Sequence, residues 1–263
     1  MVKLAAIEIK NLTKKFGNLT AVDDVSLNIE KGEIFAFLGP NGAGKSTIIK
    51  ILTTILSPTS GTMVVGCFNV NSDRHKVREN IGVIFQDHSL DDELTAYENL
   101  YYHAVLYKIP KSERKERIEQ MLDYVGLLEK KDKFVKTFSG GMKRRIEVAR
   151  GLLHSPEILF LDEPTLGLDV QTRSFLWNHI KRINKEKAIT IFFTTHNMDE
   201  AERIAAKIAV IDRGKIIVYG SAEEIKSRTG TGSLEDAFLK LTGRSIREQP
   251  ADNLEYMRRR FGR

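Results

Sequence analysis

The chain has 263 residues, of which 41% are hydrophobic and 29% are charged, and its formal net charge is +6. This balance is typical of globular proteins and excludes disordered and fibrous chains, and the length suffices for one large domain or for a core with an inserted lobe. The basic excess is too small to indicate nucleic-acid binding. A single cysteine, Cys67, cannot form an internal disulfide and fits a reducing compartment.

No stretch of the sequence predicts a membrane-spanning helix. Apolar runs such as residues 188–193 have the length of a strand, whereas a helix that crosses a bilayer needs roughly twenty apolar residues. The N-terminal residues carry charges after too short an apolar stretch for a secretory signal, so we expect no export signal. The chain is therefore expected not to span a membrane.

The N-terminal part predicts a small antiparallel sheet beside a strand–loop–helix unit. Residues 6–10 and 25–29 alternate apolar and polar side chains, and residues 61–65 are expected to join them. An apolar strand that ends at residue 38 leads into Gly39-Pro-Asn-Gly-Ala-Gly-Lys-Ser-Thr47, which opens a helix. A glycine-rich loop between a strand and a helix is the setting that a phosphate-binding P-loop requires.

The P-loop supplies most of the groups that hold a nucleoside triphosphate. Its glycines let backbone N–H groups face phosphate oxygens at the positive end of the following helix. Lys45 adds a charge for the outer phosphates, Ser46 a hydroxyl for Mg²⁺, and Thr47 reaches an inner phosphate. The candidate nucleotide-binding residues of this loop are Gly39, Pro40, Asn41, Gly42, Ala43, Gly44, Lys45, Ser46 and Thr47.

The pattern becomes helical after a predicted buried strand at residues 81–85. Apolar and aromatic side chains from Tyr97 to Tyr107 recur at helical spacing and are expected to lie in the core, and a charged helix is expected at 112–125. Strands then alternate with helices again, which indicates a parallel α/β core. These later elements are strands at 158–162, 189–193, 207–211 and 216–219, and helices at 171–184 and 198–205.

The predicted fold class is α/β: a P-loop core with a mainly parallel sheet and flanking helices, an antiparallel β subdomain and an inserted helical subdomain. We expect a nucleotide-binding domain over residues 1–220, with its core at 1–86 and 156–220 and its helical subdomain at 87–155. A C-terminal helical tail is expected at 221–263, with two short amphipathic helices and a basic end that contains Arg258, Arg259, Arg260 and Arg263.

Two carboxylates, Asp162 and Glu163, close the apolar strand that begins at Ile158. Such a pair is also typical of a plain acidic turn, but the P-loop in the same chain favours the arrangement that P-loop ATPases call Walker B. Asp162 is then expected to hold Mg²⁺, and Glu163 to orient or deprotonate the attacking water.

A second anion site is predicted at Phe138-Ser-Gly-Gly-Met-Lys-Arg-Arg145, which opens a helix with Ser139 as its N-cap. By itself this segment is more typical of an ordinary helix cap. Three polar residues each follow a predicted strand or turn: Gln86, Asp169 and His196. Each would be considered structural in isolation.

In this order, the motifs resemble the ATP-binding subunit of ABC transporters, over residues 5–220. The resemblance implies that Phe16 stacks on adenine, that Asp169 crosses a dimer interface, and that Ser139, Gly140 and Gly141 bind the γ-phosphate of a nucleotide held by a second subunit. It also implies catalytic roles for Lys45, Glu163 and His196, and a Mg²⁺ site at Ser46, Gln86 and Asp162. Met142 and Phe138 replace a common glutamine and leucine, but neither change removes a backbone donor.

The same resemblance implies ATP and Mg²⁺ as cofactors, and a homodimer or heterodimer that encloses two ATP molecules. It also implies a separate transmembrane permease, and a peripheral location of this chain at the cytoplasmic face of the cell membrane. Four segments look most like the drug-resistance group of exporters, which implies export of a drug, lipid or other hydrophobic compound. They are residues 87–100, 162–173, 194–201 and 234–243.

Other functions stay open at this point. An importer's ATPase subunit would carry the same motifs. A soluble ABC ATPase that acts on nucleic acid or ribosomes would carry them too, but that class usually has two such domains or a long coiled-coil insertion, and neither is seen in the sequence. A nucleotide sensor without hydrolysis conflicts with the presence of Glu163 and His196. Nucleic acid is not an expected partner.

Overall fold

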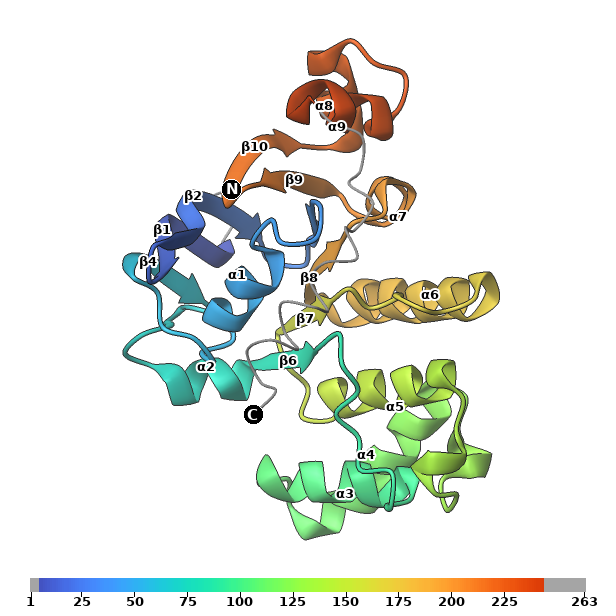
Figure 1. Cartoon of the computed structure of the whole chain (residues 1–263). Coiled ribbons are helices and arrows are strands. Elements are labelled where there is room, and N and C mark those ends of the chain that lie inside the picture. The colour runs from blue at the N-terminus through green and yellow to red at the C-terminus, as the bar shows by residue number, and fades with distance from the viewer. Residues whose placement is uncertain (1–4, 244–263) are drawn as a thin grey trace, which may run out of the picture.

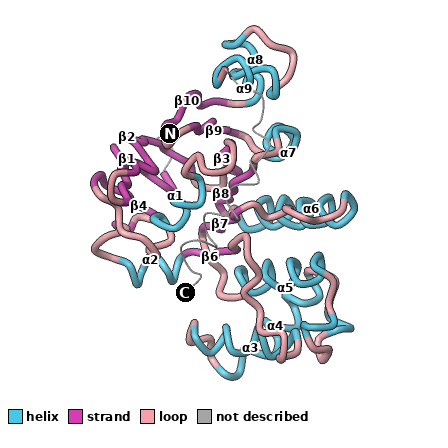
Figure 2. The backbone as a smooth tube through the Cα atoms, viewed as in Figure 1, coloured by secondary structure: helices cyan, strands magenta, loops and turns pink. Residues whose placement is uncertain are grey.

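The structure is a computed structural model that describes residues 5–243. The basic C-terminal end expected from the sequence lies outside the described residues. Helices, sheets and loops alternate along the chain as Figure 2 shows, and Figure 1 labels the main elements. Among the described residues, no helix combines the length and the apolar character needed to cross a bilayer.

A six-stranded sheet forms the centre of the molecule, with the strand order β10-β9-β3-β8-β7-β6. All neighbours are parallel except β10, which pairs antiparallel with β9. The strands are β3 (Ile34–Leu38), β6 (Ile81–Ile84), β7 (Ile158–Asp162), β8 (Thr190–Thr195), β9 (Lys207–Asp212) and β10 (Lys215–Gly220). The predicted parallel core is therefore confirmed, and the strands expected at 207–211 and 216–219 pair as an antiparallel hairpin.

A second, antiparallel sheet has the order β2-β1-β4-β5. Its strands are β1 (Ala5–Phe16), β2 (Leu19–Glu30), β4 (Ser60–Val65) and β5 (Phe68–Asn69). The first two strands are more than twice as long as the alternating segments that predicted them. The reason is a series of register shifts between the two strands, which interrupt the alternation beyond Ile9.

The helices surround the central sheet and build a separate lobe at one end (Figure 1). They are α1 (Lys45–Leu52), α2 (Arg74–Asn80), α3 (Ala96–Leu106), α4 (Lys111–Tyr124), α5 (Gly140–Leu152), α6 (Val170–Lys187), α7 (Met198–Ile204), α8 (Ala222–Thr229) and α9 (Leu234–Thr242). Two short 3₁₀ helices, Leu128–Lys130 and Val135–Thr137, lie between α4 and α5.

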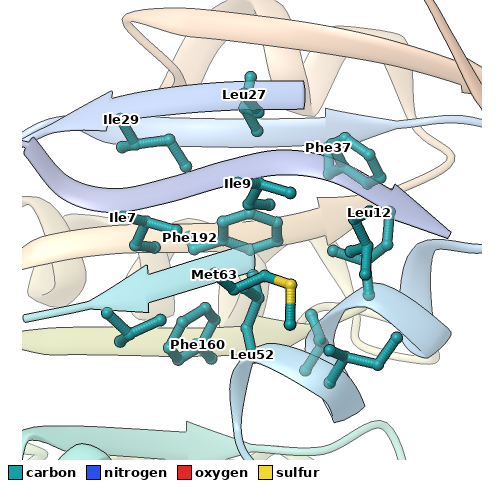
Figure 3. Packing of buried hydrophobic residues seen from close by; sticks show 14 of the residues in the cluster. Ile7, Ile9, Leu12, Leu27, Ile29, Phe37, Leu52, Met63, Phe160 and Phe192 are labelled. Carbon is teal, nitrogen blue, oxygen red and sulfur yellow. The ribbon is translucent and has the colours of Figure 1, made fainter. Parts of the chain in front are cut away.

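Side chains of the central strands alternate between two hydrophobic cores. Phe160 and Phe192 pack with α1 and the antiparallel sheet, whereas Leu161 and Phe193 face the core that contains α5 to α9. Figure 3 shows the first of these cores, with side chains of the antiparallel sheet against Phe160 and Phe192. Because both faces are covered, every residue of β7 and β8 is buried.

The helical lobe has a third core of its own, made by α3, α4 and α5. Leu100 and Ala104 of α3 are fully buried there, as the helical spacing predicts. Val105 is 40% exposed, however, and Tyr97 and Tyr107 are only partly buried. Since α3 packs on α4 and α5 with one side only, the aromatic stripe extends beyond the buried face.

The last two helices pack on the central sheet. Ala222 and Ile225 of α8, and Leu234, Ala237 and Phe238 of α9, are all buried in the core shared with α6 and α7. Residues 222–242 are thus part of the folded body, although the sequence suggested a tail.

We therefore expect that Phe238→Ala destabilises the whole domain. The phenyl ring is 3% exposed, and removing such a ring from a packed core costs about 3–5 kcal/mol. Urea unfolding, followed by circular dichroism, measures the loss. Leu106→Ala is the control, since that side chain is 76% exposed. An unfolding midpoint unchanged by Phe238→Ala would mean that α9 is not packed on the core in solution.

Candidate active site

The P-loop, Gln86, Glu163 and His196 follow the carboxyl ends of four neighbouring strands. In the parallel registers, Leu38 of β3 pairs with Thr195 of β8, and Thr194 of β8 pairs with Asp162 of β7. The P-loop, His196 and Glu163 therefore leave the sheet side by side. The carboxyl edge of an open parallel sheet is where α/β proteins usually bind ligands.

Close backbone approaches explain two of the P-loop glycines. A Cβ atom at Gly39 would lie 2.3 Å from the carbonyl oxygen of Ile211, and one at Gly44 would lie 2.5 Å from that of Ala21. Gly44 also has a φ of 107°, a conformation that side chains disfavour. The loop ends at Lys45, the first residue of α1, so the N–H groups of this helix open toward the site.

A cavity of about 800 Å³ lies over this loop. Its lining brings together Phe16 from β1, the P-loop, Gln86 beyond β6, Glu163 beyond β7 and His196 beyond β8. The full set of lining residues is Phe16, Leu19, Ala21, Pro40, Asn41, Gly42, Gly44, Lys45, Ser46, Thr47, Gln86, Glu163, Leu166 and His196. Phe16 is 46% exposed, so its ring is accessible for stacking.

The two carboxylates have different surroundings. Asp162 is 3% exposed and accepts hydrogen bonds from Ser46 Oγ at 3.1 Å and from Thr194 Oγ1 at 2.6 Å. Glu163 has a positive φ of 47°, unusual for a residue with a side chain, and its backbone N–H donates to the same Thr194 oxygen. This backbone turn places the Glu163 carboxylate on the cavity wall.

Two basic side chains hold the Glu163 carboxylate. Lys45 Nζ lies 3.1 Å from Glu163 Oε1 and donates to the carbonyl oxygens of Gly39 and Pro40, while His196 Nδ1 lies 2.9 Å from Glu163 Oε2. Burial acts to raise the pKa of Glu163, but the hydrogen bond from His196 and the charge of Lys45 together bring this pKa below its usual value. The bond to Glu163 raises the pKa of His196 in turn.

The donor set around Asp162 fits a magnesium ion. A carboxylate and a hydroxyl, from Asp162 and Ser46, already lie 3.1 Å apart, and Gln86 lines the P-loop cavity together with Ser46. Mg²⁺ is usually bound by one or two protein oxygens together with substrate phosphates. Among residues 5–243, no cluster of three acidic, histidine or cysteine side chains could hold a metal alone.

The signature residues, Ser139, Gly140 and Gly141, lie outside this cavity. Ser139 caps α5, since its side chain accepts from the backbone N–H of Met142, and it is exposed together with Gly140. Asp169 caps α6 in the same way, through Thr172 N–H. Neither Asp169 nor the run from Ser139 to Gly141 lines the wall of the P-loop cavity.

Several residues that hold the site are not apparent from the sequence. Thr194 joins Asp162 to the backbone of Glu163, and Arg144 of α5 donates to backbone carbonyls at the end of β7. Glu200 of α7 is 6% exposed and accepts from Thr165 and other neutral donors. One signal was available: charged residues at core-facing positions of α5 and α7.

The parallel sheet, the glycine loop before α1 and the carboxylates beyond β7 define a P-loop ATPase. The family model described as ABC transporter matches residues 22–166. The chain belongs to this family, as its ATP-binding and ATP-hydrolysing domain.

Named relatives and solved structures agree with this assignment. The linearmycin resistance ATP-binding protein LnrL of Bacillus subtilis is 38% identical, over 92% of this chain and 76% of its own length. The daunorubicin/doxorubicin resistance ATP-binding protein DrrA of Streptomyces peucetius is 40% identical, over 87% and 69%. A solved ATP-binding subunit of an ABC transporter is 28% identical with a TM-score of 0.82, over 90% and 99%. A dimeric cassette bound to ADP and Pi is 29% identical with a TM-score of 0.75, over 82% and 98%.

The ion pair gives a prediction for the pH titration of His196. Its raised pKa means that it keeps its proton to higher pH than an exposed histidine, so the pair stabilises the fold at low pH and this contribution is lost as pH rises through the raised pKa. In Glu163→Gln the pKa of His196 should fall toward its ordinary value of about 6.5.

Histidine NMR titration of the nucleotide-free protein measures this change, with the signal assigned by its loss in His196→Gln. The other five of the six histidines serve as internal controls and should not respond. Identical titration curves for His196 in both proteins would show that the ion pair does not form in solution.

Proposed function

We propose that this protein is the ATP-hydrolysing subunit of an ABC exporter and that it works at the cytoplasmic face of a membrane, bound to a separate permease. The observation that carries the proposal is the single cavity that joins the P-loop, Gln86, Glu163 and His196. The names of its relatives support the direction of transport, since LnrL and DrrA are both described as resistance proteins. The transported compound is then a drug or another hydrophobic molecule.

ATP binding rests on the P-loop and Phe16. The adenine ring stacks on Phe16, while loop N–H groups and Lys45 hold the phosphates. Lys45 now faces Glu163 and two backbone carbonyl groups. Phosphate oxygens compete for this lysine, so binding of ATP frees the carboxylate for chemistry.

Hydrolysis uses Glu163 and His196. Glu163 lines the cavity beside the P-loop, and its ionised carboxylate aligns the attacking water and accepts its proton. His196 orients this carboxylate and lines the same cavity, where it would contact the γ-phosphate of bound ATP. Ser46, Asp162 and Gln86 would hold Mg²⁺, which would supply positive charge to the phosphate oxygens.

We further propose that the complete site needs two chains. The N-terminus of α5 with Ser139, Gly140 and Gly141 is an anion site, but it lies outside the cavity of its own chain. In a two-fold dimer it covers the ATP of the partner, and Asp169 crosses the interface. ATP then links the two subunits, and loss of phosphate after hydrolysis releases them. This opening and closing moves the permease.

The role of Glu163 is tested by Glu163→Gln. The amide keeps the size of the side chain but cannot accept a proton, so kcat should fall by about 10²–10⁴-fold. ATP binding should persist, because the P-loop is unchanged. Steady-state phosphate release and binding of a fluorescent ATP analogue measure the two properties separately. Near-normal turnover would exclude Glu163 as the base.

The shared site is tested by mixing two inactive chains. Lys45→Ala removes the phosphate lysine, and Gly140→Asp adds a repelling carboxylate to the signature. A Cβ atom at Gly140 meets nothing within 4 Å, so this variant should fold. In a mixed dimer, one of the two sites combines the intact P-loop of one chain with the intact signature of the other. About half of the dimers in an equal mixture are mixed, so about a quarter of the wild-type number of sites is restored.

ATPase activity measured against the mixing ratio gives the result. Recovery on mixing, with each variant inactive alone, is the expected outcome. If the mixture stays as inactive as its components, each site is completed within a single chain and the proposal of a shared site is wrong.

A further inference from the structure

Arg144 is a buried arginine that the proposed chemistry does not use. It lies one turn into α5, five residues after Ser139, and only 3% of it is exposed. A buried guanidinium is costly unless all its donors find partners. The acceptors that satisfy this one lie at the ends of two strands of the central sheet.

The guanidinium donates to four backbone carbonyl groups. Nε donates to Pro164 at 2.8 Å, and Nη2 donates to Asp162 and Glu163 at 3.3 Å each. Nη1 donates to Phe85, the residue before Gln86. One side chain of α5 thus holds both the turn that carries Glu163 and the segment that carries Gln86.

Glu147 completes this arrangement. Its carboxylate is 2% exposed and lies 3.0 Å from Arg144 Nη1. It also accepts from the backbone N–H of Ser89 at 2.9 Å and contacts His88 Nδ1 at 3.2 Å. The pair therefore fixes the segment after Gln86 as well as the segment before it.

The backbone of Glu163 needs this support. A residue with a side chain rarely adopts a φ of 47°, and such a conformation persists only where surrounding contacts impose it. Thr194 holds the N–H of Glu163 at 3.0 Å, while Arg144 and the N–H of Leu166 hold its carbonyl oxygen. Without Arg144 the turn loses the contacts that join it to α5.

We propose that Arg144 is a positioning residue for ATP hydrolysis: it fixes the left-handed backbone of Glu163 and the segment of Gln86, and so sets the direction of the Glu163 carboxylate. This proposal rests on the proposed role of Glu163. The helix α5 then has two roles. Its first turn binds the ATP of the partner subunit, and its Arg144 aligns the catalytic carboxylate of its own chain.

The test separates positioning from stability with three variants of the full chain: Arg144→Met, Glu147→Leu and the double variant. Arg144→Met leaves the Glu147 carboxylate buried without its partner, so the unfolding midpoint falls. The double variant also removes the unpaired Glu147 charge and should recover the part of the midpoint that this buried charge costs. It cannot restore the contacts to the carbonyl groups of Phe85, Asp162, Glu163 and Pro164.

We expect kcat to fall about 10- to 100-fold in Arg144→Met, the effect of a catalytic group displaced by roughly 1 Å. KM for ATP should change little, because the P-loop is untouched. The double variant should stay equally slow although part of its stability has returned. Arg117→Met is the control, since it removes an exposed arginine paired with Glu113 in α4.

Two outcomes would overturn the proposal. A normal kcat in Arg144→Met would by itself overturn the positioning role. Recovery of kcat together with the unfolding midpoint in the double variant would reduce Arg144 to a structural residue. A parallel measurement of Glu163→Gln keeps the two proposals apart: if that variant is inactive while Arg144→Met is not, only the positioning role fails, and if it is active, the role of Glu163 fails first.

A spectroscopic readout supports the same distinction. The titration of His196 reports its distance from the Glu163 carboxylate, since these two side chains form an ion pair at 2.9 Å. Displacement of the carboxylate in Arg144→Met should lower the pKa of His196, whereas Arg117→Met should leave it raised. An unchanged titration in Arg144→Met would show that Glu163 has kept its place and would count against the proposal.

Discussion

The candidate site depends on the register of four parallel strands, β3, β8, β7 and β6. Side chains alternate between two covered faces, so a shift of one residue would exchange the two cores and is strongly disfavoured. With the register fixed, Thr194 stands opposite Asp162, and His196 leaves the sheet next to Glu163. The chemistry at the edge of the sheet is thus positioned by hydrophobic packing in its interior.

Buried charges connect this edge to the surrounding helices. Such groups are stable only with several partners, and removing one partner costs more than replacing a pair by apolar side chains. Glu200 illustrates the same rule with neutral donors, because its carboxylate accepts from Thr165, from Trp177 at 2.7 Å and from Thr195 at 2.6 Å. It thereby fastens the loop beyond the Walker B carboxylates to α6 and to the strand that precedes His196.

Local patterns made the fold class predictable. The P-loop and the carboxylates beyond β7 are continuous runs of sequence, and the helix expected at 112–125 differs from α4 (Lys111–Tyr124) by one residue at each end. Elements whose pattern is disturbed were less predictable. The register shifts between β1 and β2 interrupt the alternation of apolar and polar residues, so more than half of each strand could not be predicted. The core-facing residues of α8 and α9 were too few to distinguish packed helices from a tail.

The candidate site was predictable only where its residues belong to motifs. Arg144 and Thr194 act through tertiary contacts that no short segment encodes, and each resembles an ordinary polar residue in the sequence. The three-residue spacing of Arg144 and Glu147 is typical of an exposed ion pair on a helix surface. Their core-facing positions in α5 indicate burial, but only the fold shows which strand ends the pair contacts.

The N-terminus of α5 lies outside the cavity of its own chain, and this separation affects how much ATP unassembled subunits consume. Under the proposed shared site, a solitary subunit holds ATP without the groups that complete hydrolysis, so turnover by free subunits depends on their meeting and falls steeply on dilution. A permease that binds two subunits raises their local concentration by orders of magnitude. Assembly with the permease would then activate ATP hydrolysis, and surplus free subunits would hydrolyse little ATP.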